Sequence, residues 1–306
     1  MRWTTAFVFG AFVLASEVAG AAEPMDSAES TESTESTEPT ESTEPTESAE
    51  PTESTESQEP AESSNGVETV QLWVPRGRWL INAFVEANVS SGSAFKPVSL
   101  SPDIWYGATD KLTIGLVHSS LGETGFVGGF GDSLCVTGSS SGCSKAYNRV
   151  GVTARYRLLA GAWTWAAAGG LIARSISPFQ LAAKLGVVGR WNRNRFAVEL
   201  EPALSFGVSN RDGGTGAGPN KDTLTAPVAA WYSFTASAAL SVQTGLVLPL
   251  QDSSKSYSIP LSFGVHYRVS DPFTVALAFS FVDLIGGGDG AGVDIRSLTL
   301  GGSYAL

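Results

Sequence analysis

Apolar and polar side chains alternate in short segments along most of the chain after residue 79. In the segment 257–269, one face collects Tyr257, Ile259, Leu261 and every second residue after them, and the other collects Ser, Pro, Gly, His and Arg. Because successive side chains of an extended strand point to opposite sides, this two-residue period predicts β-strands whose two faces meet different surroundings. Twelve such strands are predicted, starting near residues 79, 98, 111, 148, 163, 179, 195, 223, 237, 257, 273 and 293.

The connections between these strands alternate in length. Tight turns are predicted around residues 109–110, 160–162, 192–194, 235–236 and 270–272. Longer stretches rich in Gly and Ser lie at residues 90–97, 122–147, 209–222, 251–256 and 286–292, with 174–178 as the shortest of this set. Alternation of tight turns with long loops is typical of outer-membrane barrels, whose periplasmic turns are short and whose outer loops are long.

Aromatic residues gather near the short-turn ends of the predicted strands. Such a cluster indicates an aromatic girdle at one membrane interface. Its predicted members are Trp79, Tyr106, Tyr156, Trp163, Trp191, Phe196, Tyr232, Phe234, Tyr267, Phe273 and Tyr304. The opposite girdle is thinner, with Phe179, Phe206, Tyr257 and Phe281 as candidates.

Residues 79–306 resemble the bacterial outer-membrane β-barrel proteins, without pointing to one named family. The closing segment "RSLTLGGSYAL" places Leu298, Leu300, Tyr304 and Leu306 in step, although it ends on leucine where that group usually has an aromatic residue. The resemblance implies an all-β fold: a transmembrane antiparallel β-barrel of about twelve strands, surrounded by outer-membrane lipid and inserted by the barrel assembly machinery. The alternative is a soluble β-sandwich or lipocalin-like barrel, which the outward apolar stripe on nearly every strand disfavours.

The first 65 residues predict two further regions. Residues 1–22 have one positive charge at Arg2, an apolar run and small residues at the end, which is typical of a secretory signal peptide. Residues 23–65 repeat Thr-Glu-Ser and Thr-Glu-Pro, with almost no apolar side chain to bury, and predict a disordered acidic linker. The predicted domains are therefore a signal peptide (1–22), a linker in the periplasm whose partner there is unknown (23–65) and an outer-membrane barrel (66–306).

The net charge of the whole chain hides a division between linker and barrel. The formal charge is −11, but from residue 65 onward 18 Lys and Arg face 15 Asp and Glu. The predicted barrel is thus slightly basic, and it has no basic stripe that would indicate nucleic-acid binding. Cys135 and Cys143 are the only cysteines, and in an exported protein we expect them to form a disulfide across "VTGSSSG". No metal site and no cofactor are predicted.

Assigning the apolar face of each strand to lipid leaves a charged inward face. An interior of small and charged side chains indicates a narrow, water-filled and mildly basic pore that passes small solutes or ions, with the cations tuning selectivity. The alternative is a nonconducting structural or adhesive barrel stiffened by salt bridges. The predicted inward set is Asn82, Glu86, Asp103, Arg149, Arg155, Arg157, Lys184, Arg190, Glu199, Glu201, His266 and Arg268.

A hydrolase remains an alternative because of His118 and Ser120. Both continue the lipid-facing phase of Leu112, Ile114 and Leu116, and some outer-membrane lipid hydrolases are similar in placing a His-x-Ser pair at that rim. Asn148 would orient the imidazole in such a site. The pair is equally acceptable where a strand meets polar headgroups, so the sequence favours a rim over a catalytic site. The loop 122–147 either folds over the mouth as a constriction or is a stabilised outer loop.

Overall fold

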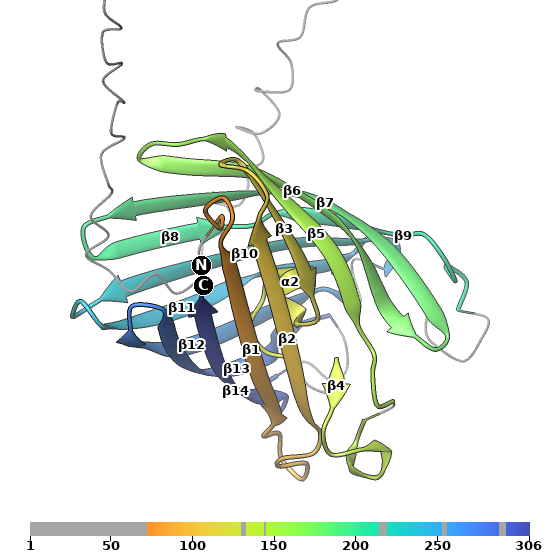
Figure 1. Cartoon of the computed structure of the whole chain (residues 1–306). Helices are drawn as coiled ribbons and strands as arrows, with labels where there is room; N and C mark the ends of the chain where they lie inside the picture. Colours follow the sequence, from red (N-terminus) through yellow and green to blue (C-terminus); the bar gives the residue numbers. More distant parts are fainter. Residues whose placement is uncertain (1–71, 130–132, 144, 214–218, 253–255, 288–291) are drawn as a thin grey trace, which may run out of the picture. The chain divides into compact units, whose positions relative to one another are not determined.

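The computed structural model describes residues 72–306, except 130–132, 144, 214–218, 253–255 and 288–291. The predicted signal peptide (1–22) and linker (23–65) lie outside the described residues. One antiparallel sheet contains all the named strands (Figure 1). The elements are β1 (Trp79–Asn88), β2 (Val98–Gly107), β3 (Leu112–Val117), α2 (Ser120–Thr124), β4 (Leu134–Cys135), η1 (Ser139–Ser141), β5 (Val150–Leu159), β6 (Trp163–Ile176), β7 (Phe179–Arg193), β8 (Phe196–Leu200), β9 (Ala203–Gly207), β10 (Thr223–Ser233), β11 (Ala238–Pro249), η2 (Leu250–Asp252), β12 (Ser258–Ser270), β13 (Phe273–Gly286) and β14 (Arg296–Ala305).

The sheet closes on itself as a barrel. β1 pairs with β2 on one side and with β14 on the other, from Leu80↔Ala305 to Asn88↔Ser297. β8 and β9 are two parts of one wall strand, since both lie between β7 and β10, and β4 is a two-residue piece that pairs with β2. The wall therefore has the twelve strands that the sequence predicts, and closure leaves it without an exposed edge.

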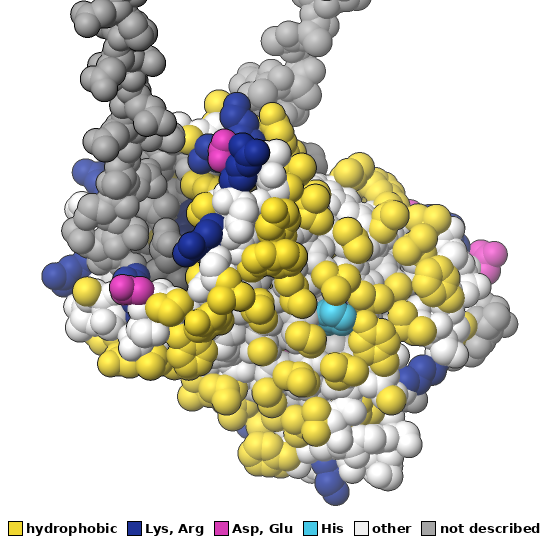
Figure 2. Space-filling view, in the orientation of Figure 1, with side chains coloured by type: hydrophobic (Ala, Val, Ile, Leu, Met, Phe, Trp, Pro, Cys, Tyr) yellow, Lys and Arg dark blue, Asp and Glu magenta, His cyan; other side chains and the backbone are white. Residues whose placement is uncertain are grey.

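The two faces of the wall are inverted relative to a water-soluble protein. Outward-facing Leu277 and Leu300 are 48% and 55% exposed, whereas inward-facing Ser99 and Asp103 are 0% and 1% exposed. Hydrophobic side chains spread over the face made by β1, β2, β3 and β5 in Figure 2. An apolar outside and a polar inside are what a bilayer imposes on a barrel, because the outward side chains meet lipid tails and the inward ones do not. Closure of the sheet satisfies the backbone groups, which lipid cannot do.

The predicted aromatic girdle is confirmed by ring contacts on the outer surface. Trp79 packs against Tyr106 with ring centroids 4.6 Å apart, and Phe196 packs against Tyr232 at 4.8 Å. These rings belong to neighbouring strands at the short-turn end of the barrel. The girdle is therefore a row of interacting rings, as expected at a membrane interface.

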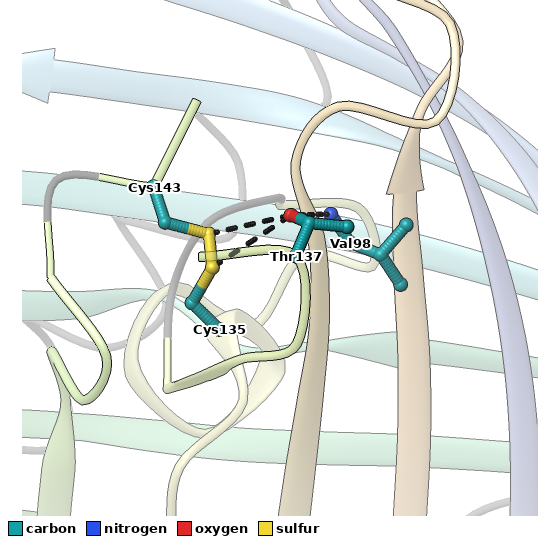
Figure 3. The surroundings of a disulfide bond; sticks show 4 residues. All are labelled: Val98, Cys135, Thr137 and Cys143. Carbon is teal, nitrogen blue, oxygen red and sulfur yellow. Dashed lines mark hydrogen bonds between the residues drawn. A yellow bond between two sulfur atoms is a disulfide. The ribbon is translucent and has the colours of Figure 1, made fainter. Parts of the chain in front are cut away.

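The disulfide between Cys135 and Cys143 is present, as predicted, in the long connection from β3 to β5 (Figure 3). Thr137, between the two cysteines, accepts a hydrogen bond from the Val98 N–H at 3.1 Å, and Cys135 itself pairs with Ser99 of β2. The disulfide hairpin is thus attached to the start of β2. No helix among the described residues is long and apolar enough to cross a membrane.

Candidate functional site in the barrel lumen

The connection after β3 leaves the wall early and turns into the barrel. β3 ends at Val117, and the next two backbone N–H groups, of His118 and Ser119, donate to Asp103 Oδ1 at 2.6 and 3.0 Å. The Ser119 hydroxyl donates to the other oxygen of the same inward-facing carboxylate at 2.5 Å and also caps the short helix α2. A single buried acid on β2 therefore sets the direction in which the chain leaves the wall. Residues 118–129 are called the inward loop below.

The first half of the inward loop is attached to the wall by charge. Glu123 of α2 lies 2.9 Å from Arg149 Nε and 2.6 Å from Arg174 Nε, and its side chain is 7% exposed. Lys184 on β7 donates to the Gly122 carbonyl at 3.2 Å. Three cations, from the connection before β5, from β6 and from β7, thus hold α2 against one side of the lumen.

The second half of the inward loop is attached to the other side by neutral groups. The Val127 N–H donates to Gln243 Oε1 at 2.7 Å, and Gln243 Nε2 donates to the Gly125 carbonyl at 2.7 Å. The Val127 carbonyl accepts from Ser262 Oγ at 3.1 Å and from Ser280 Oγ at 3.2 Å. Because these partners lie on β11, β12 and β13, the inward loop crosses the lumen from one wall to the other.

A second segment enters the lumen near the short-turn end. In residues 72–78, called the N-terminal segment below, Leu72 packs against Ala166, Ala168 and Val188 on the inner face of β6 and β7. Val74 donates its N–H to Thr113 Oγ1 at 2.9 Å.

Gly107 at the end of β2 makes room for this segment. A Cβ atom on Gly107 would stand 2.0 Å from the Pro75 carbonyl oxygen, so a larger residue would displace the N-terminal segment. The Gly77 N–H donates to the Gly107 carbonyl at 2.8 Å. The lumen is therefore narrowed from both directions.

The inward charges of β5 to β8 form pairs. Glu201 lies 3.1 Å from Arg155 and 2.9 Å from Lys184, and all three side chains are less than a tenth exposed. Glu199 faces Arg190 at 3.9 Å. In a low-dielectric interior such pairing is required, since an isolated buried charge is costly.

Each of three arginines also stacks on a tryptophan that points inward. Arg155 lies 4.8 Å from the ring centre of Trp105, Arg157 lies 5.0 Å from Trp73, and Arg190 lies 5.5 Å from Trp231. Stacking of this kind adds a cation–π attraction and covers one face of each ring. The tryptophans come from β2, β10 and the N-terminal segment, so the contacts tie three parts of the barrel together.

Two small cavities lie beside the inward loop among the described residues. The larger, of about 80 Å³, is lined by residues including Leu72, Val74, Trp105, Leu121 and Trp231. The smaller, of about 70 Å³, lies toward β12, β13 and β14. Six residues line both cavities, which places them side by side: Asn82, Leu121, Val127, Ser241, Gln243 and His266.

Solved structures with the same architecture include bacterial porins and other outer-membrane proteins. The NanC porin matches with a TM-score of 0.52 and 12% identity, covering 74% of this chain and 100% of that chain. The chain has the fold of a bacterial outer-membrane β-barrel. A KdgM porin in complex with disordered oligogalacturonate has 10% identity, covers 74% of this chain and 99% of that chain, and has a TM-score of 0.48. No protein-family model and no curated protein matches the sequence.

Within this outer-membrane barrel fold, the predicted inward residues lie as follows. Glu86 accepts from the Gly129 N–H at 3.3 Å, His266 Nε2 lies 2.8 Å from Ser241 Oγ, and Arg268 is opposite Thr274, which lines the smaller cavity. The others line the larger cavity or make the pairs and stacks described above: Asn82, Asp103, Arg149, Arg155, Arg157, Lys184, Arg190, Glu199 and Glu201.

Sequence reasoning missed Glu123, Arg174 and Gln243. Arg174 and Gln243 continue the inward phase of their strands, so a longer reading of the same alternation would have found them. Glu123 carries no comparable signal, because it lies in a loop. Its role depends on the inward direction that Asp103 imposes.

His118 and Ser120, which the sequence predicts at the lipid-facing rim, are buried in the structure. The strand ends before His118, and Ser120 is the first residue of α2. His118 and Ser120 are 8% and 6% exposed, against 40% for both Ile114 and Leu116 before them. The His118 ring bonds through Nδ1 to the Pro102 carbonyl at 2.5 Å, and Ser120 Oγ donates to the Phe126 carbonyl at 3.3 Å. Asn148 is also buried, so the three residues do not present a lipid-exposed site.

Proposed function

We propose that the protein is an outer-membrane channel for the passive passage of small solutes, with the inward loop as its constriction. The main support for this proposal is that residues 118–129 cross the lumen beside two adjoining cavities. Loops that fold into a barrel limit the size of what passes and place specific groups on the path. The NanC porin, which shares the fold, is named as a porin and supports the proposal.

In this proposal the inward cations act mainly as anchors. Arg149 and Arg174 hold Glu123, and Arg155 and Lys184 hold Glu201. Charges that are already paired exert a weaker field on a passing ion than isolated charges do. The path therefore runs along the opposite wall, β11 to β14, where the inward side chains are mostly Ser, Thr, Ala and Gly.

The proposal extends to location. The predicted signal peptide, residues 1–22, would export the chain, and the predicted linker, residues 23–65, would lie in the periplasm before β1.

The paired charges around Glu201 favour a second candidate, a nonconducting scaffold, because salt-bridge networks also stiffen closed barrels. Conduction decides between the two.

The test is single-channel current from the purified full-length chain in a planar bilayer. The channel predicts small, discrete conductance steps. Silence from a barrel whose folding is shown by its heat-dependent gel mobility would support the scaffold and overturn the channel.

Glu123→Gln sharpens this test. Losing the carboxylate removes both charge pairs of α2, so we expect larger or more frequent open steps, because the inward loop leaves the lumen more often. Asp222→Asn is the matched control, since Asp222 pairs with Arg211 at 2.7 Å in the connection between β9 and β10. Equal currents from the two variants would show that the inward loop does not limit conduction.

A further inference from the structure

The two adjoining cavities have a shared chemical character that the sequence does not reveal. Leu121 and Val127 from the inward loop line both cavities, and Leu72 and Val74 from the N-terminal segment line the larger one. Trp105 and Trp231 form part of the sides of the larger cavity. A barrel whose inward face is largely polar thus has an apolar middle, made by the two segments that are inserted into it.

Most charged groups beside the two cavities, together called the chamber below, are held by partners. Of those that line the larger cavity, Arg155 and Glu201 pair with each other at 3.1 Å, whereas Glu199 lies 3.9 Å from Arg190 and its Oε2 has no hydrogen-bond partner among the described residues. Asp103 accepts two backbone N–H groups and a hydroxyl at the base of the inward loop. An ion in the chamber would lose hydration and gain little in exchange, which makes a desolvated ion unfavourable there.

Polar groups that can orient an uncharged ligand also line the two cavities. Asn82 lines both cavities, and so do Ser241 and His266, which bond to each other at 2.8 Å. Apolar and aromatic walls with a few placed polar groups are the usual lining of a small-molecule pocket. The two cavities, of about 80 and 70 Å³, lie side by side. Taken together they are close in size to the apolar cavity of about 150 Å³ that accommodates benzene.

We propose that the chamber binds small, uncharged molecules with an apolar or aromatic face, and that the barrel admits these solutes more readily than ions, which pass it only in small conductance steps. This inference rests on the proposed channel function for transport, but binding in the chamber is measured independently of transport. Leu121 and Val127 determine the specificity, because they line both cavities and belong to the segment that crosses the lumen.

The binding test uses phenol as the probe, with benzoate as the charged aromatic and glycerol as the uncharged molecule without an apolar face. Isothermal titration of the detergent-solubilised protein should show saturable phenol binding and no saturable binding of the other two. Leu121→Asn should weaken phenol binding at least tenfold. Leu277→Asn is the control, because it makes the same change on the outer surface, where the side chain is 48% exposed. This variant should bind phenol as tightly as the unmodified chain does. It also controls for phenol that dissolves in the detergent.

Three results would overturn the inference: no saturable phenol binding, benzoate binding as tightly as phenol, or equal phenol binding by Leu121→Asn and Leu277→Asn. Val127→Asn is the second variant, for use if Leu121→Asn does not fold. It changes the same constriction from another position of the inward loop.

A conductance measurement separates this inference from the channel itself. Leu121→Asn should raise single-channel conductance severalfold, because a polar constriction stays hydrated. Current without saturable phenol binding would leave the channel standing and reject the chamber. Phenol binding without current from any variant would keep the chamber and reject the channel.

Discussion

The inner faces of β5 to β8 and of β11 to β14 hold the same inward loop by different means. The first, the charged wall, binds Glu123 through Arg149 and Arg174 and binds Gly122 through Lys184. The second, the neutral wall, binds Val127 through one amide and two hydroxyls. Breaking a buried ion pair costs about 3–5 kcal/mol, whereas a neutral hydrogen bond contributes about 1 kcal/mol. The difference indicates that the inward loop is fixed on the charged wall and leaves the neutral wall first.

Glu201→Gln should produce the largest effect, because it removes the acid that two buried cations share. Arg155 and Lys184 would remain in the charged wall without that carboxylate, and we expect a loss of about 3–5 kcal/mol in the free energy of unfolding. Urea unfolding of the refolded barrel measures it. Glu199 lies 3.9 Å from Arg190, so Glu199→Gln should lower the free energy of unfolding less than Glu201→Gln does. An equal loss in both variants would contradict the stronger contribution assigned to the Glu201 pairs.

Gln243→Ala should have an intermediate effect, on the inward loop and not on the whole barrel. It removes the hydrogen bonds to Val127 and Gly125, which together contribute about 2 kcal/mol. The equilibrium between the attached and the released inward loop should therefore shift toward release more than tenfold. The time spent in a larger-conductance state should rise accordingly. Ser262→Ala, which leaves Ser280 bonded to the Val127 carbonyl, should give a smaller change in the same direction. If the two variants match the unmodified chain, the neutral wall does not hold the loop.

The sequence predicts the wall of this molecule well because each strand carries its own two-residue signal. The twelve strands, the alternating connections and the aromatic girdle all follow from local patterns. The strands begin within two residues of the predicted positions, except the last, which begins three residues later than predicted, at Arg296. The contents of the lumen do not follow from such patterns. Val127 bonds to residues 116 and 153 positions away in the chain, and no local period reports a contact of that kind.

The error at His118 has the same origin. The alternation of Leu112, Ile114 and Leu116 continues formally through His118 and Ser120, but Asp103, fifteen residues earlier in the chain, accepts the His118 N–H and ends the strand. A carboxylate on a neighbouring strand thus overrides the local period. The inserted N-terminal segment has a visible signal, since Leu72, Trp73 and Val74 are three consecutive apolar residues a few positions after the polar tract 23–65.

The most direct test of the constriction is a reversible cross-link between the inward loop and the neutral wall. Val127→Cys with Ser262→Cys places one thiol on each side of the contact between the inward loop and β12, where the Ser262 hydroxyl now donates to the Val127 backbone carbonyl at 3.1 Å and both residues line the smaller cavity. The account predicts that the oxidised double variant forms the cross-link and carries less current, and that reductant restores the current. The unmodified chain in the same reductant controls for its own Cys135–Cys143 disulfide. A cross-link that forms and leaves the current unchanged would contradict the account, and so would a failure of the two thiols to react.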